Sequence, residues 1–192
     1  EISTRDWSSD VCSSDLEVGR KAISAVVQGP VSKPYDGTTT ATLTSANYVL
    51  AGFVNGESAT VNQTSAAFDS AAAGTNKPVT ATLATGNFAA GANTVLTNYT
   101  LPSSATGAVG VIEKKAVTGS FSATNKVYDG SVAATVGDRS VSGAISGDDV
   151  SLSGGTAAFG SATAGNGKTV TLSGAGLSGA KASNYTLSSV TT

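Results

Sequence analysis

The sequence of 192 residues contains no histidine and no methionine, and it has only one cysteine and one tryptophan. Without histidine, the chain lacks the commonest general base and the commonest metal ligand. A single cysteine can form neither an intramolecular disulfide nor a cysteine-based metal site. These shortages exclude the classes of enzyme and metalloprotein that depend on histidine or on paired cysteines.

The sequence also lacks an apolar run of about 18 residues, the length that a membrane-spanning helix needs. It carries 11 basic and 13 acidic residues, which gives a net charge of −2. A chain so close to neutral gives no electrostatic case for binding a nucleic acid or an anionic membrane. We therefore expect no nucleic-acid partner, no membrane insertion within this chain and no cofactor.

The first sixteen residues differ in composition from the rest. They contain the only cysteine (Cys12), the only tryptophan (Trp7) and four of the 13 acidic residues. The string RDWSSDVCSSDL resembles the translation of a sequencing adapter, and we interpret residues 1–16 as an artefact or a disordered tail. The alternative is a polar N-terminal linker. Without this segment the chain loses one basic and four acidic residues, so its net charge moves from −2 to +1.

The remaining sequence contains two copies of one unit. Short motifs recur in the same order in both copies, beginning with Lys-Ala at 21–22 and at 115–116. Repetition of this kind predicts tandem copies of one fold. We expect repeat 1 to span 17–114 and repeat 2 to span 115–192, with the last strand of repeat 2 missing. The shared structural motif comprises Tyr35, Asp36, Gly37, Asn98 and Tyr99 in repeat 1, and Tyr128, Asp129, Gly130, Asn184 and Tyr185 in repeat 2.

Both units have the pattern of β-strands. Segments such as VSLSG (150–154) and SNYTLSS (183–189) alternate apolar with small polar residues, the period of a half-buried strand. The best helical candidate, TSAAFDSAAAG (64–74), has a glycine-bearing counterpart in repeat 2, so we predict a strand and a loop there. The expected fold is all-β, with two tandem small Ig-like β-sandwiches. A β-grasp-like sheet is the alternative.

The Tyr-Asp-Gly triplet predicts a turn in each repeat. Aspartate hydrogen-bonds its own nearby backbone, and glycine adopts a positive φ without a Cβ clash. We expect the preceding tyrosine to lay its ring on the core with its hydroxyl near water. Lys33 and Lys126 are expected to pair with a surface carboxylate. The alternative, a Tyr/Asp/Lys catalytic cluster, would need a third group and a cleft, and we expect no enzyme activity.

Two further motifs are weak. The stretch ATAGNGKT (162–169) fits a loose phosphate-binding loop, but a strand-like segment follows it where such a loop needs a helix. Asp148 and Asp149 offer oxygen ligands for calcium, but adjacent strand residues point to opposite faces, so we expect a solvated loop. An isopeptide bond between a lysine and an asparagine is conceivable at Lys33 or Lys126, with Asn98 or Asn184, although nothing in the spacing selects these pairs.

One combination of motifs is specific. The strings KVYDGSVAATV, SGDDVSL, GTAAFGSATAGNGKTVTLSG and SNYTLSS resemble the YDG-type repeat of bacterial surface proteins, including filamentous-haemagglutinin-like adhesins. The resemblance is close over 115–192 and looser in the first copy. It implies a fragment of a secreted or cell-surface protein, in which extracellular β modules act as spacers or adhesive units without catalytic residues. The implied partners are neighbouring repeats and a host or cell-surface protein or glycan. The alternative is an accessory or glycan-binding module of a secreted enzyme.

Overall fold

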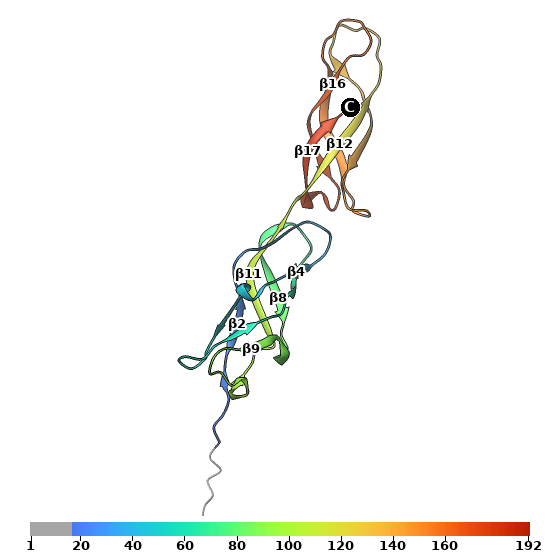
Figure 1. The fold of residues 1–192 in the computed structure, drawn as a ribbon. Helices are drawn as coiled ribbons and strands as arrows, with labels where there is room; N and C mark the ends of the chain where they lie inside the picture. The colour runs from blue at the N-terminus through green and yellow to red at the C-terminus, as the bar shows by residue number, and fades with distance from the viewer. Residues whose placement is uncertain (1–16) are drawn as a thin grey trace, which may run out of the picture.

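The computed structural model describes residues 17–192, and their regular structure consists of β-strands and short 3₁₀ helices. The predicted all-β class is confirmed. A β-grasp-like sheet packs against a helix, and the described residues form no α-helix that could serve this purpose. The adapter-like string lies in residues 1–16, outside the described residues. Figure 1 shows two bodies placed end to end, with the chain passing once from the first to the second.

Repeat 1 is built around strand β11 (Ser104–Glu113). β11 pairs antiparallel with β8 (Gly74–Thr82) on one side, and parallel with β2 (Ser24–Val27) and β3 (Val31–Pro34) on the other. The order of the main sheet is β4-β7-β8-β11-β2-β5, and the pairs β1–β10 and β6–β9 lie outside it. The remaining elements are β1 (Lys21–Ala22), β4 (Thr40–Thr42), η1 (Ser45–Asn47), β5 (Tyr48–Ala51), β6 (Ala59–Val61), β7 (Ser65–Phe68), η2 (Thr85–Asn87), β9 (Phe88–Ala90), η3 (Leu96–Asn98) and β10 (Tyr99–Thr100).

Repeat 2 consists of two three-stranded sheets, ordered β14-β12-β17 and β13-β15-β16. In the first sheet, β12 pairs antiparallel with β14 and parallel with β17. A small core containing Phe121, Leu152 and Leu172 draws side chains from both sheets. The elements are β12 (Lys115–Ala123), β13 (Ala133–Ala134), β14 (Val136–Ser142), β15 (Ser151–Phe159), β16 (Val170–Ser178), η4 (Ala182–Asn184) and β17 (Tyr185–Thr191).

The alternation in the sequence explains which faces are buried. In β8, Val79 and Ala81 are fully buried while the threonines between and beside them are exposed, as expected for a strand with one face on the core. The segment 64–74, which was the best helical candidate, forms β7 followed by a loop, as predicted.

The core of repeat 1 does not stop at the end of the repeat. Its cluster of buried apolar residues continues through Tyr35 to Val117 and Tyr185 of repeat 2. The connection is short, because β11 ends at Glu113 and β12 begins at Lys115, so one residue separates them. The two repeats therefore share buried surface, and β11 and β12 form a nearly continuous strand that runs from one repeat into the other (Figure 1).

Candidate functional site at the joint between the repeats

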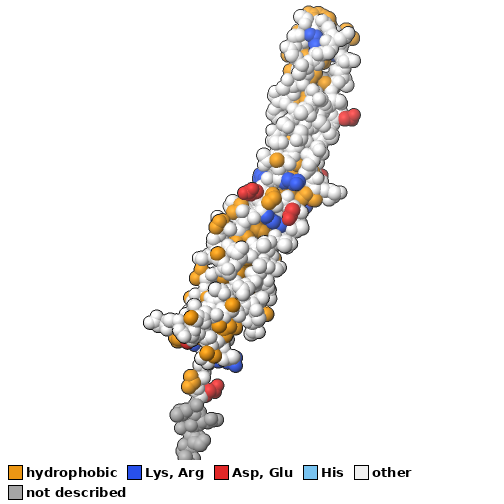
Figure 2. All heavy atoms as spheres, viewed as in Figure 1, with side chains coloured by type: hydrophobic (Ala, Val, Ile, Leu, Met, Phe, Trp, Pro, Cys, Tyr) orange, Lys and Arg blue, Asp and Glu red, His pale blue; other side chains and the backbone are white. Residues whose placement is uncertain are grey.

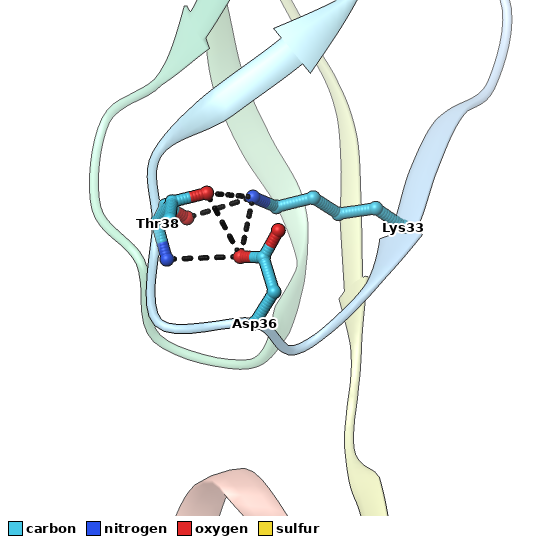
Figure 3. A network of polar contacts seen from close by, with 3 residues as sticks. All are labelled: Lys33, Asp36 and Thr38. Atoms are coloured by element: carbon cyan, nitrogen blue, oxygen red, sulfur yellow. Dashed lines mark hydrogen bonds and ion pairs between the residues drawn. The ribbon is translucent and has the colours of Figure 1, made fainter. Parts of the chain in front are cut away.

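The Tyr-Asp-Gly turn of repeat 1 is held by a small polar network (Figure 3). The Asp36 carboxylate accepts hydrogen bonds from the backbone N–H of Thr38 at 2.9 Å and from the Lys33 ammonium at 2.8 Å. The same ammonium donates to the Thr38 carbonyl at 2.8 Å. Gly37 has a φ of +78°, a conformation that a residue with a Cβ rarely adopts. The hydrogen bond from Lys33, followed by the one from Thr38, lowers the pKa of Asp36 to about 2.

Repeat 2 forms the same turn with the same chemistry. Asp129 accepts from the Lys126 ammonium at 2.8 Å and from the backbone N–H of Ser131 at 2.9 Å. Gly130 has a φ of +75°, and the hydrogen bond from Lys126 lowers the pKa of Asp129 to about 2. The turn is therefore a local unit, since all the groups that hold it lie within a few residues of one another.

Tyr35 leaves this turn and points into repeat 2. Its hydroxyl donates a hydrogen bond to the Asp148 carboxylate at 2.9 Å. Its ring meets the ring of Tyr185 edge to face, with centroids 5.3 Å apart and planes at 79°. Such an aromatic pair contributes about 1 kcal/mol beyond the area that it buries. Only 3% of Tyr35 is exposed, so the residue acts as a plug that joins the two repeats.

The part of repeat 2 that receives Tyr35 forms a socket, which we define as Asp148, Asn184, Tyr185 and the backbone of Ile145. Tyr185 donates its hydroxyl proton to Asp148 and accepts a hydrogen bond from the Ile145 N–H at 3.0 Å. Asn184, which is 4% exposed, accepts a hydrogen bond from the backbone N–H of Ala73 in repeat 1 at 2.9 Å. Among the described residues, no buried side-chain oxygen or nitrogen lacks a hydrogen-bond partner, as buried polar groups require.

The joint changes how its tyrosines titrate. Burial, and then the hydrogen bond to Asp148, raises the pKa of Tyr35 above its usual 10.0. The same two causes raise the pKa of Tyr185. Both hydroxyls remain protonated donors at neutral pH, which is the state that Asp148 needs if it is to accept from both.

Repeat 1 has a socket of the same design at its far end. Tyr99 donates its hydroxyl proton to Glu57 and accepts a hydrogen bond from the Val54 N–H at 3.1 Å. The ring of Phe53 meets Tyr99 with centroids 4.9 Å apart and planes at 62°. Repeat 2 has Ala144 at the position of Phe53, and the small side chain leaves room for the incoming ring of Tyr35. Asn98, the counterpart of Asn184, is exposed.

Two expectations drawn from the sequence were wrong. Tyr35 does not keep its hydroxyl near water, because the hydroxyl binds a carboxylate of the other repeat. Tyr128 does not lay its ring on a core, because 67% of it is exposed. The role of Asp148 was also missed, since we expected it in a solvated loop. The signal that could have revealed this role is the acid that ends the matched motifs GFVNGE and GAISGD.

The other sequence motifs are placed as follows. Residues 162–169 form the loop between β15 and β16, and a strand rather than a helix follows them. Asp149 accepts a hydrogen bond from the Ala180 N–H at 2.8 Å, whereas Asp148 accepts from the two tyrosine hydroxyls of the joint. Lys33 and Lys126 bind their own turns, while Asn184 binds Ala73, so the structure pairs neither lysine with an asparagine.

Across residues 17–192, no three histidine, cysteine or acidic side chains lie close enough together to hold a metal ion. In the same range, no helix has the length and apolar character needed to cross a membrane. Figure 2 shows that the charged side chains on the visible face gather at mid-length, where the repeats meet, with few elsewhere.

Comparison with known proteins agrees with the repeat structure. The family model of the YDG domain matches residues 19–107 and, a second time, residues 113–192. No curated protein and no solved structure matches the chain. Since the two matches cover nearly all of the described residues, the chain belongs to the YDG domain family.

Proposed function

We propose that this chain is a non-catalytic spacer in an extracellular array, part of an adhesin-like protein that is secreted by bacteria or held at their surface. Neighbouring repeats are the direct partners of each unit. A host or cell-surface protein or glycan is the target that the exposed faces of the array contact. The role of the two repeats is to hold what lies beyond them at a fixed distance and direction.

The observation that carries this proposal is the joint. Tyr35 is buried against Tyr185 and Asp148, and the linker between β11 and β12 is the single residue Lys114. Domains joined by long polar linkers move relative to one another, whereas a shared apolar core restrains them. The buried plug and the short linker therefore favour a stiff, straight pair of repeats.

The absence of catalysis is supported by the state of the polar groups. The acidic and phenolic side chains that the fold brings together, such as Asp148 with Tyr35 and Glu57 with Tyr99, hydrogen-bond each other. The raised pKa of Tyr35 makes it a weaker acid than free tyrosine, which does not suit a general base or a nucleophile at neutral pH.

Small-angle X-ray scattering of the full chain tests the proposal. We expect an elongated, rigid particle, and we expect Asp148→Ala to make the two bodies move independently, because it removes the acceptor of two hydroxyls. Tyr128→Ala is the matched control, since the same tyrosine is exposed in repeat 2 and should leave the scattering unchanged. A wild-type curve that requires freely moving bodies, or a compact globule, would contradict a rigid spacer.

A further inference from the structure

Repeat 2 contains a cleft of about 630 Å³ that corresponds to a filled position in repeat 1. One wall is the segment 125–131, with Tyr128, and the other is the loop 161–168; Phe159 also lines the cleft. Among the described residues, neither 124–128 nor 165–169 belongs to a strand. The two segments make backbone hydrogen bonds only at their ends, from the Thr124 N–H to the Thr135 carbonyl and from the Gly160 N–H to the Thr169 carbonyl.

Repeat 1 shows how such a cleft is occupied. There the end of β11 runs between β3 and β8, with Gly110 opposite Val31 on one side and opposite Lys77 on the other. Ile112, two residues later, is 2% exposed and belongs to the core. The strand also fixes the plug, since the backbone N–H of Tyr35 donates to the Glu113 carbonyl at 2.8 Å.

The walls of the cleft in repeat 2 keep the conformation of their counterparts. Gly167 has a φ of +65°, and Asn76, at the matched position of repeat 1, has a φ of +54°. The Lys168 ammonium donates to Ser161 at 2.7 Å, and the Lys77 ammonium donates to Ser70 at 2.6 Å. The lysine of each Tyr-Asp-Gly turn also lies over the matched phenylalanine ring, at 5.7 Å in both repeats.

The two repeats differ in how far their matched aromatic side chains are buried. Phe68 is 4% exposed under β11, whereas Phe159 is only half-buried. Val127 and Tyr128 are 89% and 67% exposed, while the matched Tyr35 is buried. The cleft thus presents the half-buried Phe159 ring among mostly polar residues, together with two backbone segments that belong to no strand. Backbone segments of this kind can accept an added strand.

We propose that this cleft is a strand-acceptor site. Its occupant is an extended segment with the chemistry of Gly107–Glu113: a glycine against the Phe159 ring, followed two residues later by a branched apolar side chain that enters the core. The segment would lie parallel to 124–127 and antiparallel to 165–168. The bound segment would also fix the backbone of Tyr128, as β11 fixes that of Tyr35. Tyr128 could then enter the socket of another repeat in the way that Tyr35 enters the socket of repeat 2. This inference does not depend on the spacer function.

The glycine is the selective element of the occupant. A Cβ on Gly110 would lie 2.6 Å from a ring carbon of Phe68 and 2.8 Å from the Lys77 carbonyl oxygen. No side chain fits at that distance without displacing the ring or the neighbouring strand. A valine in place of the glycine should therefore weaken binding by about tenfold or more.

The test uses the full chain and the synthetic peptide GAVGVIEKK, which has the sequence of residues 107–115. Hydrogen exchange should slow at 124–128 and 165–168 when the peptide binds, and the already paired strand edges of repeat 1 should not change. The matched control peptide GAVVVIEKK, with valine for Gly110, should give no protection. Equal protection by the two peptides would contradict the specific site.

A second arrangement keeps the test decisive when binding in trans is weak. Joining AVGVIEKK after Thr192 makes the association intramolecular and raises its effective concentration. We expect this extended chain to show the protection and a higher unfolding midpoint, and the valine version to show neither. Equal behaviour of the two extended chains would overturn the proposal. A dimer of the original chain that shields the cleft and is not dissociated by the peptide would also overturn it, because the occupant would then be a second copy.

Discussion

The two repeats carry the same turn, but their tyrosines have opposite surroundings. Both turns hold an aspartate whose pKa is lowered to about 2, and both have a glycine with a positive φ. Nevertheless, Tyr35 is 3% exposed and Tyr128 is 67% exposed. The turn is therefore set by local chemistry, whereas the environment of the tyrosine is set by the strand beside it and by the socket beyond it.

The largest difference between the repeats should appear when each tyrosine is truncated in turn. We expect Tyr35→Ala to lower the free energy of unfolding by about 3 kcal/mol or more, because it empties a buried aromatic site. The matched variant Tyr128→Ala should change it by no more than about 0.5 kcal/mol, as is usual for an exposed side chain. Urea unfolding followed by far-UV circular dichroism measures both. Similar losses in the two variants would show that Tyr128 is packed as Tyr35 is.

A second substitution gives the socket of repeat 2 the larger side chain that the socket of repeat 1 has. Ala144→Phe would give repeat 2 the residue that repeat 1 has at Phe53, and its ring would compete with Tyr35 for the face of Tyr185. Overpacking of this kind costs about 1–3 kcal/mol, and here it should be relieved by separation of the repeats. Small-angle scattering should show two loosely coupled bodies, while circular dichroism should keep its β-sheet spectrum.

The reciprocal variant Phe53→Ala provides the control for this experiment. It opens the socket of repeat 1 at the end away from the joint, so the coupling between the repeats should stay as it is. If Ala144→Phe leaves the scattering of the two repeats unchanged, the small size of Ala144 is not what makes room for the Tyr35 ring.

Replacing only the hydroxyl should have a smaller effect. Tyr35→Phe keeps the ring against Tyr185 but removes one of the two hydroxyls that bind Asp148. The expected loss is about 1 kcal/mol, the usual net value of one hydrogen bond. Tyr128→Phe should cost nothing measurable, and thermal unfolding of the two variants in parallel would show the contrast. An equal loss of stability in both variants would show that the hydrogen bond from Tyr35 to Asp148 does not stabilise the protein.

The smallest effect should be the same in both repeats. The folded pKa of Asp36 and of Asp129 is about 2, below the usual 3.8, so their contribution is complete above pH 3.8 and is lost as pH falls toward 2. Asp36→Asn and Asp129→Asn should each flatten the acid limb of the stability curve to a similar, modest degree, because both carboxylates are half exposed. Urea midpoints between about pH 5 and pH 2 would measure this, and a clear inequality would mean that the two turns are not equivalent.

These contrasts explain what could be predicted from the sequence. The strands follow from short-range alternation, and the turn follows from aspartate and glycine acting within a few residues of each other. The joint was not predictable in this way, because Tyr35 and Asp148 are 113 residues apart. Its traces in the sequence are the acid that ends the matched motifs and the change from Phe53 to Ala144 within them. Neither trace reveals which ring fills the space.

One feature of the topology bears on how the chain responds when its ends are pulled. The strands that open and close each repeat are paired in parallel: β1 with β10 and β2 with β11 in repeat 1, and β12 with β17 in repeat 2. Tension along the chain drags parallel end strands past each other, so the hydrogen bonds between them are loaded together in shear rather than opened one at a time. The single residue Lys114 leaves almost no slack between the repeats, so tension passes directly from β11 to β12.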